Sequence, residues 1–173
     1  IVRHCFLTSL FLKQRRVNAH LERRQLMADS LHQIVIEADQ HTIYQALTQN
    51  QGIQAWWTDA CDMAQQEGDT CQFWFDNRQT CFTMRANKML DGQRVFWVCL
   101  DGPKEWVDTQ LWWEIQPLID GRCLLDFKHM NWKKDNGIFA LCNSTWGNLL
   151  QHLKEYCEEG RVNPWFHNLK ASA

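Results

Sequence analysis

The sequence lacks the features that mark several specialised classes of protein. No apolar run reaches the roughly 18 residues that a membrane-spanning helix requires, so we predict no membrane span. The formal net charge is only −2, which gives the chain as a whole no electrostatic attraction to nucleic acid. Charged residues make up 22% of the 173 residues and apolar residues 45%, a balance that excludes disorder throughout and supports one packed domain.

Signatures of metal sites, disulfide frameworks and familiar catalytic centres are also missing. None of the 8 cysteines forms a C-x-x-C pair. The sequence has no G-x-S-x-G elbow, no glycine-rich phosphate loop and no H-x-E motif followed by C-x-x-C. We therefore predict no metal and no cofactor, and we interpret the cysteines as reduced, buried side chains of a cytoplasmic protein.

Charge is distributed unevenly between the start of the chain and the rest. Residues 1–26 hold six Lys or Arg and a single acid, and the first methionine, Met27, follows them. Three interpretations stay open: an extension that precedes a true start at Met27, a basic tail that contacts an anionic partner, or a targeting peptide. We treat residues 1–28 as a non-native or disordered extension, residues 29–165 as the domain and residues 166–173 as a tail.

The remaining sequence predicts a strand, two short helices and a run of strands. Residues 31–37 are short and β-branched, and Asp39 can cap a helix that ends at Leu47. A second short helix covers about residues 52–57, and a polar loop follows. Alternating apolar residues then predict strands over residues 70–75, 80–90, 93–100, 107–118 and 122–130.

The first hairpin of this run is predicted from the pair Asp91-Gly92, which is typical of a two-residue turn. That turn sets Met84 opposite Cys99. It also sets Ala86 opposite Trp97, so that these four side chains belong to one apolar face of the sheet.

The last hairpin requires a three-residue turn. With Asp120-Gly121 as a two-residue loop, Ile115 would face Asp126, and apolar and charged residues would share a face. A loop from Ile119 to Gly121, with Gly121 in the left-handed conformation, moves the pairing by one residue. The resulting pairs are Ile115 with Leu125, Trp113 with Phe127 and Leu111 with His129.

Residues 136–159 form the longest predicted helix. Its inward side chains recur at helical spacing: Ile138, Leu141, Cys142, Thr145, Trp146, Leu149, Leu150, Leu153 and Tyr156. Asp135 or Asn136 can cap its start, and Gly160 ends it. The element order predicts an α+β fold in which a curved antiparallel sheet of about six or seven strands wraps the long C-terminal helix.

Several segments together resemble a known family. Ile34–Ala38, Ile43–Thr48 and Ile53–Trp57 resemble the opening of START-like (SRPBCC, Bet v 1-like) domains, and in particular the branch of heat-shock-protein-90 ATPase activator homologues. Asp126–His129 resembles the final strand of that branch, which often ends in His. Asn143–Arg161 resembles its last helix, with Trp, then Leu, and a Gly-Arg exit.

This resemblance implies a helix-grip fold, in which a seven-stranded antiparallel sheet wraps the C-terminal helix, often around an apolar cavity. The superfamily includes carriers of hydrophobic ligands, polyketide cyclases, oxygenase domains and co-chaperones, so the fold alone does not select a function. Co-chaperone members carry a separate N-terminal domain, whereas about 30 residues precede the domain here. We find no candidates for the metal ligands of the oxygenase members.

Candidate ligand-binding residues follow from the predicted concave face of the sheet. The chain holds 10 Trp and 9 Phe, and large rings on both sides of one layer are hard to pack without voids. We predict a pocket lined by Trp57, Phe73, Met84, Trp97, Trp113, Phe127, His129, Trp146 and Leu150. The alternative is that these side chains form an ordinary core. Four further tryptophans are expected at edges or on the outer face: Trp106, Trp112, Trp132 and Trp165.

His129 is the polar member of this set. It can serve as an acid or base at the mouth of a cavity, or as a histidine with a purely structural role at a strand end. Three functions stay open. We favour the binding of a hydrophobic or amphipathic small molecule, without catalysis. The alternatives are a protein-interaction module of the chaperone-activator type and a polyketide cyclase- or dehydratase-like enzyme, in which His129 would be the catalytic residue.

Overall fold

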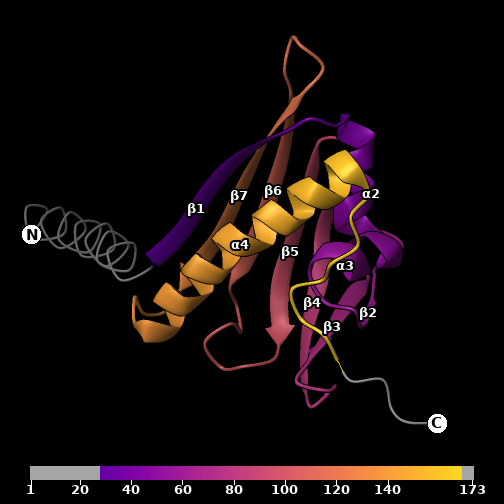
Figure 1. Ribbon diagram of the computed structural model, residues 1–173. Helices are drawn as coiled ribbons and strands as arrows, with labels where there is room; N and C mark the ends of the chain where they lie inside the picture. The colour runs from indigo at the N-terminus through magenta and orange to yellow at the C-terminus, as the bar shows by residue number, and fades with distance from the viewer. Residues whose placement is uncertain (1–27, 169–173) are drawn as a thin grey trace, which may run out of the picture.

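The computed structural model describes residues 28–168, which form one seven-stranded antiparallel sheet and three helices (Figure 1). The strands are β1 (Ala28–Ile36), β2 (Cys61–Asp62), β3 (Thr70–Phe75), β4 (Thr80–Leu90), β5 (Arg94–Asp101), β6 (Gln110–Pro117) and β7 (Cys123–Trp132). The helices are α2 (Gln40–Thr48), α3 (Asn50–Trp56) and α4 (Gly137–Glu159). No helix among the described residues is both long enough and apolar enough to cross a membrane.

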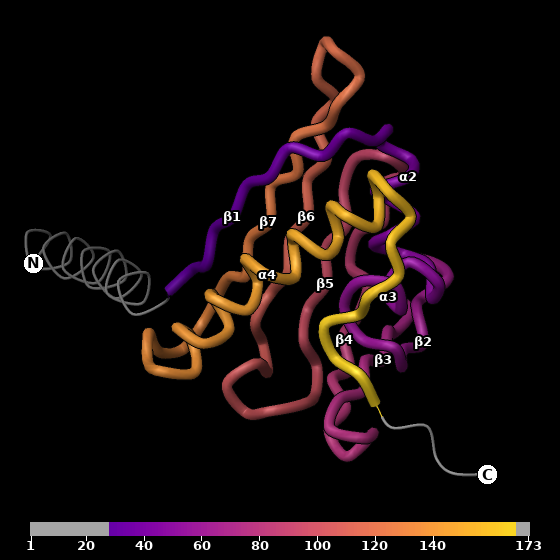
Figure 2. Tube along the Cα trace, in the orientation of Figure 1, coloured from indigo at the N-terminus to yellow at the C-terminus, as the bar shows by residue number. Residues whose placement is uncertain are grey.

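The sheet wraps α4, which crosses its concave face diagonally (Figures 1 and 2). The strand order is β1-β7-β6-β5-β4-β3-β2, so the first strand pairs with the last and the short β2 forms the opposite edge. The short helices α2 and α3 follow β1 and lie beside the C-terminal half of α4. The α+β helix-grip fold that the sequence predicts is therefore confirmed.

The predicted register of the last hairpin is confirmed. Leu111 pairs with His129, and Trp113 pairs with Phe127, across β6 and β7. Gly121 has a φ of 84°, the left-handed conformation that the three-residue turn requires. The apolar side chains of β6 and β7 consequently share the face that packs against α4.

The other hairpin differs from its prediction at the turn. Leu90 pairs with Arg94, so the loop between β4 and β5 has three residues rather than the two of Asp91-Gly92. A bulge between Ala86 and Lys88 absorbs the extra residue. Beyond the bulge Ala86 pairs with Trp97, as predicted, and the inward face is preserved.

α4 begins and ends as predicted, but two apolar side chains in its first two turns are exposed. The side chain of Asn136 accepts a hydrogen bond from the backbone N–H of Ile138, and Gly160 ends the helix in the left-handed conformation. Ile138 and Leu141, both predicted to point inward, are 41% and 67% exposed. The buried side chains of α4 are Trp146, Leu149, Leu150 and Leu153.

The chain after α4 turns back along α3 and folds onto it (Figure 2). We call residues 161–168 the strap. Its backbone N–H groups at Trp165 and Phe166 donate to the carbonyls of Trp56 and Trp57, at 3.1 and 2.9 Å. Because Ala28 also pairs in β1, the folded segment extends beyond the predicted bounds of 29–165 at both ends. Residues 1–27 and 169–173, the rest of the predicted extension and tail, lie outside the described residues.

Candidate functional site

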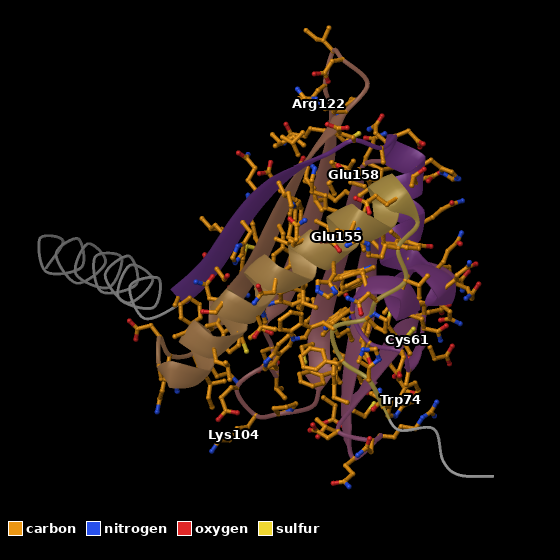
Figure 3. The ribbon with its side chains drawn as sticks, in the orientation of Figure 1. Cys61, Trp74, Lys104, Arg122, Glu155 and Glu158 are labelled. Atoms are coloured by element: carbon orange, nitrogen blue, oxygen red, sulfur yellow. The ribbon has the colours of Figure 1, made fainter. Side chains whose placement is uncertain are left out.

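The nine candidate residues lie together on the concave side of the sheet, where they form a packed core. All nine are buried: Trp57, Phe73, Met84, Trp97, Trp113, Phe127, His129, Trp146 and Leu150. The ring centroids of Trp113 and Phe127 are 4.1 Å apart, and those of Phe127 and Trp146 are 4.4 Å apart. Side chains fill the layer between α4 and the sheet (Figure 3). Of the nine, only Trp57 and Trp146 line the pocket described below.

His129 lies in this core with both ring nitrogens hydrogen-bonded. Trp146 Nε1 donates to His129 Nδ1 at 3.0 Å, so Nδ1 is the acceptor and the proton of the neutral ring lies on Nε2. Nε2 then donates to Thr109 Oγ1 at 2.9 Å. The hydroxyl of Thr109 donates in turn to the carbonyl of Trp106 at 2.6 Å. The histidine therefore links β7, α4 and the loop between β5 and β6.

The surroundings of His129 keep its ring neutral. Burial lowers the pKa of His129 from 6.5 to about 3, because a charged ring would lose its hydration. The rings of Trp106 and Trp132 pack against it, with centroids 4.4 and 4.5 Å away. Both tryptophans are buried, which corrects the prediction that they lie at edges or on the outer face. His129 thus occupies the structural position that the sequence left as an alternative.

An apolar pocket of about 570 Å³ lies beside this core, between α4, the β3–β4 hairpin, the β5–β6 loop and the strap. Seven aromatic side chains line it: Trp57, Phe75, Phe82, Trp106, Trp146, Trp165 and Phe166. The other lining residues are Asp76, Thr80, Pro103, Leu141, Cys142, Thr145 and Leu149. Leu141 and Trp165 are 67% and 40% exposed, so they form a rim at which the pocket meets solvent. The volume is in the range typical of small-molecule sites.

Contacts between aromatic rings hold the pocket walls in place. The ring of Phe75 meets those of Phe82 and Phe166 edge to face, with both centroids 5.0 Å away. Phe82 contacts Trp106 in the same way at 4.7 Å. These contacts join β3, β4, the β5–β6 loop and the strap, and edge-to-face packing of this kind is favourable. The strap is therefore part of the pocket wall.

Polar groups at the pocket are few. Asp76, the first residue after β3, accepts a hydrogen bond from the hydroxyl of Thr80 at 3.0 Å. Burial raises the pKa of the Cys142 thiol, which keeps it protonated at neutral pH. The lining is thus apolar apart from one carboxylate and the hydroxyls of Thr80 and Thr145.

Most of this pocket was missed by reasoning from the sequence. The sequence predicts Trp165 at an edge or on the outer face, and it assigns residues 166–168 of the strap to a tail. One signal was available in the helix. Where the inward face of α4 reaches the pocket it carries the small side chains of Cys142 and Thr145 beside the larger Trp146 and Leu149, and its later turns carry Leu150 and Leu153. Small side chains on an inward helix face leave space beneath them.

A second cluster brings Ser30, His32 and Asn143 together between β1 and α4. Asn143 Oδ1 accepts hydrogen bonds from Ser30 Oγ and from His32 Nε2, the latter at 2.9 Å. The imidazole nitrogen nearest the serine therefore carries a proton and cannot remove another from the hydroxyl. The cluster fastens the edge strand to the helix and does not form an activated nucleophile.

No metal centre is formed by the residues that the structure describes. No group of three or more His, Cys, Asp or Glu side chains within residues 28–168 is placed to hold an ion. The described cysteines are free, and burial raises the pKa of Cys61 and Cys99 to about 12. The thiols of Cys61, which is half-buried, and of Cys99, which is buried, are therefore protonated and not nucleophilic at neutral pH.

Comparison with known proteins gives the family. The sequence profile of the family described as "Activator of Hsp90 ATPase homolog 1-like protein" matches residues 37–158, more than half of the chain. No curated protein sequence gives a significant match. The solution structure of the Aha1 dimer from Colwellia psychrerythraea is similar to this chain, with 28% identity and a TM-score of 0.70 over 77% of this chain and 98% of that one.

Two more distant structures share the fold. Protein SSP2350 from Staphylococcus saprophyticus is 14% identical, with a TM-score of 0.67 over 82% of this chain and 100% of that one. DynU16, from the dynemicin biosynthetic locus, is 15% identical, with a TM-score of 0.66 over 80% of this chain and 50% of that one. The predicted resemblance to START-like domains and to their heat-shock-protein-90 ATPase activator branch is confirmed. The chain belongs to the Activator of Hsp90 ATPase homolog 1-like family of the START-like superfamily.

Proposed function

We propose that the protein binds an apolar small molecule in the pocket between α4, the β3–β4 hairpin, the β5–β6 loop and the strap. The observation that carries this proposal is a space of about 570 Å³ whose lining is half aromatic and which meets solvent at Leu141 and Trp165. This site is displaced from the one that the sequence predicts, because rings fill the middle of the layer beneath α4.

The expected affinity follows from the apolar surface that such a ligand would bury. A ligand that buries about 200 Å² of apolar surface gains roughly 5 kcal/mol from the hydrophobic effect. Pocket walls that are already held by ring contacts reduce the cost of ordering side chains on binding. A net gain of this size corresponds to a dissociation constant of about 0.2 mM, so we expect values of roughly 0.1–1 mM for molecules with two or three fused or linked rings.

Filling the pocket from α4 tests the proposal. The neutral fluorescent probe N-phenyl-1-naphthylamine should gain emission on binding to the unaltered protein. Thr145→Trp places a ring into the pocket and should weaken binding of the probe at least tenfold. Asn148→Trp adds the same ring to the exposed side of α4 and should bind the probe like the unaltered protein. Equal binding by all three proteins, with circular dichroism showing that all are folded, would reject the pocket as the site.

A second candidate function is interaction with a protein partner of the chaperone class. The family description and the exposed apolar side chains Ile138 and Leu141 on one side of α4 support it. We expect Leu141→Asp to abolish any effect of the protein on the ATPase rate of purified Hsp90. Leu31→Asp is the matched control, since Leu31 is 65% exposed on β1. An ATPase rate that does not change when the unaltered protein is added argues against this role.

The cyclase- or dehydratase-like alternative gains no support from the geometry. His129 does not line the pocket, and its two ring nitrogens already bond to Trp146 and Thr109. A group that cannot contact a bound molecule cannot exchange a proton with it.

A further inference from the structure

The pocket carries an unbalanced negative charge. Among the described residues that line it, Asp76 alone is charged. Its side chain accepts a hydrogen bond from Thr80, and no ion pair within residues 28–168 involves it. Asp76 is exposed, so its carboxylate lies where the pocket meets solvent and can pair with a cationic group of a ligand whose apolar part enters the pocket.

The Lys and Arg side chains that lie nearest to the pocket residues along the chain contact other groups. The guanidinium of Arg78 lies 5.4 Å from the ring centre of Trp74. Trp74 stands between two inward residues of β3 and therefore points to the convex side of the sheet. Lys104 follows the pocket residue Pro103, but its side chain is 90% exposed and is paired with Glu105 at 3.8 Å. Figure 3 shows Trp74 and Lys104 at the periphery of the molecule.

An unusual backbone conformation positions Asp76 at the pocket. Asp76, Asn77 and Arg78 are three consecutive non-glycine residues with positive φ, at 51°, 57° and 66°. This conformation is unfavourable for each of them, and it persists because surrounding contacts determine it. One such contact comes from the strap, where Asn168 Oδ1 accepts a hydrogen bond from the backbone N–H of Arg78 at 3.1 Å.

The aromatic lining of the pocket also favours a positively charged ligand. The faces of Trp and Phe rings carry negative electrostatic potential and attract organic cations, most strongly where water is excluded. Seven rings and one exposed carboxylate that forms no ion pair within residues 28–168 therefore favour a positive ligand, tolerate a neutral one and disfavour an anion.

We propose that the ligand of this pocket is an organic cation: an apolar body of fused or linked rings that bears one ammonium group near Asp76. This inference rests on the proposed function, because it assigns the chemical class of the molecule that the same pocket takes. Fatty acids and other anionic amphiphiles are excluded as the preferred ligands.

Three pyrene probes that differ in one substituent test the charge preference: 1-pyrenemethylammonium, 1-pyrenemethanol and 1-pyrenecarboxylate. Binding is followed at low salt by energy transfer from tryptophan to pyrene. The ammonium probe should bind roughly tenfold more tightly than the alcohol, and the carboxylate more weakly than both. The advantage of the ammonium probe should shrink as salt is added.

The variant Asp76→Asn assigns the effect to one residue. Asparagine accepts the left-handed backbone at least as well as aspartate, so the turn should be retained. The ammonium probe should lose its advantage, whereas affinity for the alcohol should change less than twofold. Asp62→Asn, which removes an exposed carboxylate on β2 that does not line the pocket, should bind all three probes like the unaltered protein.

The outcomes separate the two proposals. If the three probes bind the unaltered protein equally well, or if Asp76→Asn keeps the preference for the ammonium probe, the cation assignment is overturned while the pocket remains a binding site. If no pyrene probe binds and N-phenyl-1-naphthylamine also fails, the proposed function itself is rejected.

Discussion

Two adjoining regions beneath α4 are both rich in aromatic rings, yet one is closely packed and the other contains a pocket. In the solid region, around Trp113, Phe127 and Trp146, side chains from regular strands meet side chains from the helix. In the hollow region, Phe82 and Trp165 belong to walls that include a hairpin, a loop and the strap. The number of rings therefore does not decide where a cavity forms.

The residues of the covering helix account for the difference. Over the solid region α4 contributes Trp146 and Leu150, both buried. Over the hollow region it contributes the short side chains of Cys142 and Thr145, beside those of Leu141, Trp146 and Leu149. Because this space of about 570 Å³ opens to solvent at Leu141 and Trp165, it is compatible with the close packing of the rest of the interior.

The largest expected effect is a difference in how much stability is lost when a ring is removed from each region. Phe127→Ala removes a fully buried ring from the solid region and should lower the free energy of unfolding by about 3–5 kcal/mol. Phe82→Ala removes a half-buried ring that borders the pocket and should cost only about 1–2 kcal/mol. Urea denaturation at pH 7 measures both. Equal losses would mean that the two regions do not differ in packing.

The next effect concerns pH and the solid region alone. Since the pKa of His129 is about 3 in the folded protein and near its ordinary 6.5 when unfolded, the unfolded state binds more protons between these values. The stabilisation is complete above pH 6.5 and is lost as the pH falls toward 3, by up to about 1.4 kcal/mol per pH unit. His129→Gln should be less stable at pH 7, yet should lose less stability between pH 6.5 and 4.5.

The matched control for this prediction is His167→Gln, because His167 is exposed. Urea denaturation of the unaltered protein and the two variants across that pH range should show a weaker pH dependence for the His129 variant than for the other two proteins. A His129 variant whose curve runs parallel to theirs would contradict a neutral, buried histidine.

The fold could be predicted because its determinants are local and repeated. The pairing of Trp113 with Phe127 follows from a rule that one slip of register exchanges the faces of a strand. Asn136 and Gly160 mark the ends of α4 through their own backbone and side-chain chemistry. The two-residue turn at Asp91-Gly92 was wrong because a three-residue turn can be offset by a bulge further along the strand.

The pocket could not be predicted in the same way because it depends on how separate segments meet. Trp57 and Trp146 were assigned correctly to the concave side, but their sequence positions do not reveal that a cavity begins beside them. Trp165 reaches the pocket only because the strap pairs with the end of α3. His129 was identified as the notable polar residue, yet its bonds to Thr109 and Trp146 depend on tertiary contacts that periodicity does not encode.

The substitution with the smallest expected effect tests whether the hollow region is fixed or opens through movement of α4. Gly147 follows the pocket residue Trp146, is exposed, and has open space where a Cβ would lie. Gly147→Ala should therefore stiffen the helix and raise the free energy of unfolding by about 0.5–1 kcal/mol. If small side chains alone create the pocket, affinity for N-phenyl-1-naphthylamine will be unchanged. A loss of affinity in this more stable variant would show instead that binding needs α4 to bend, and the hollow region would then be a property of motion rather than of packing.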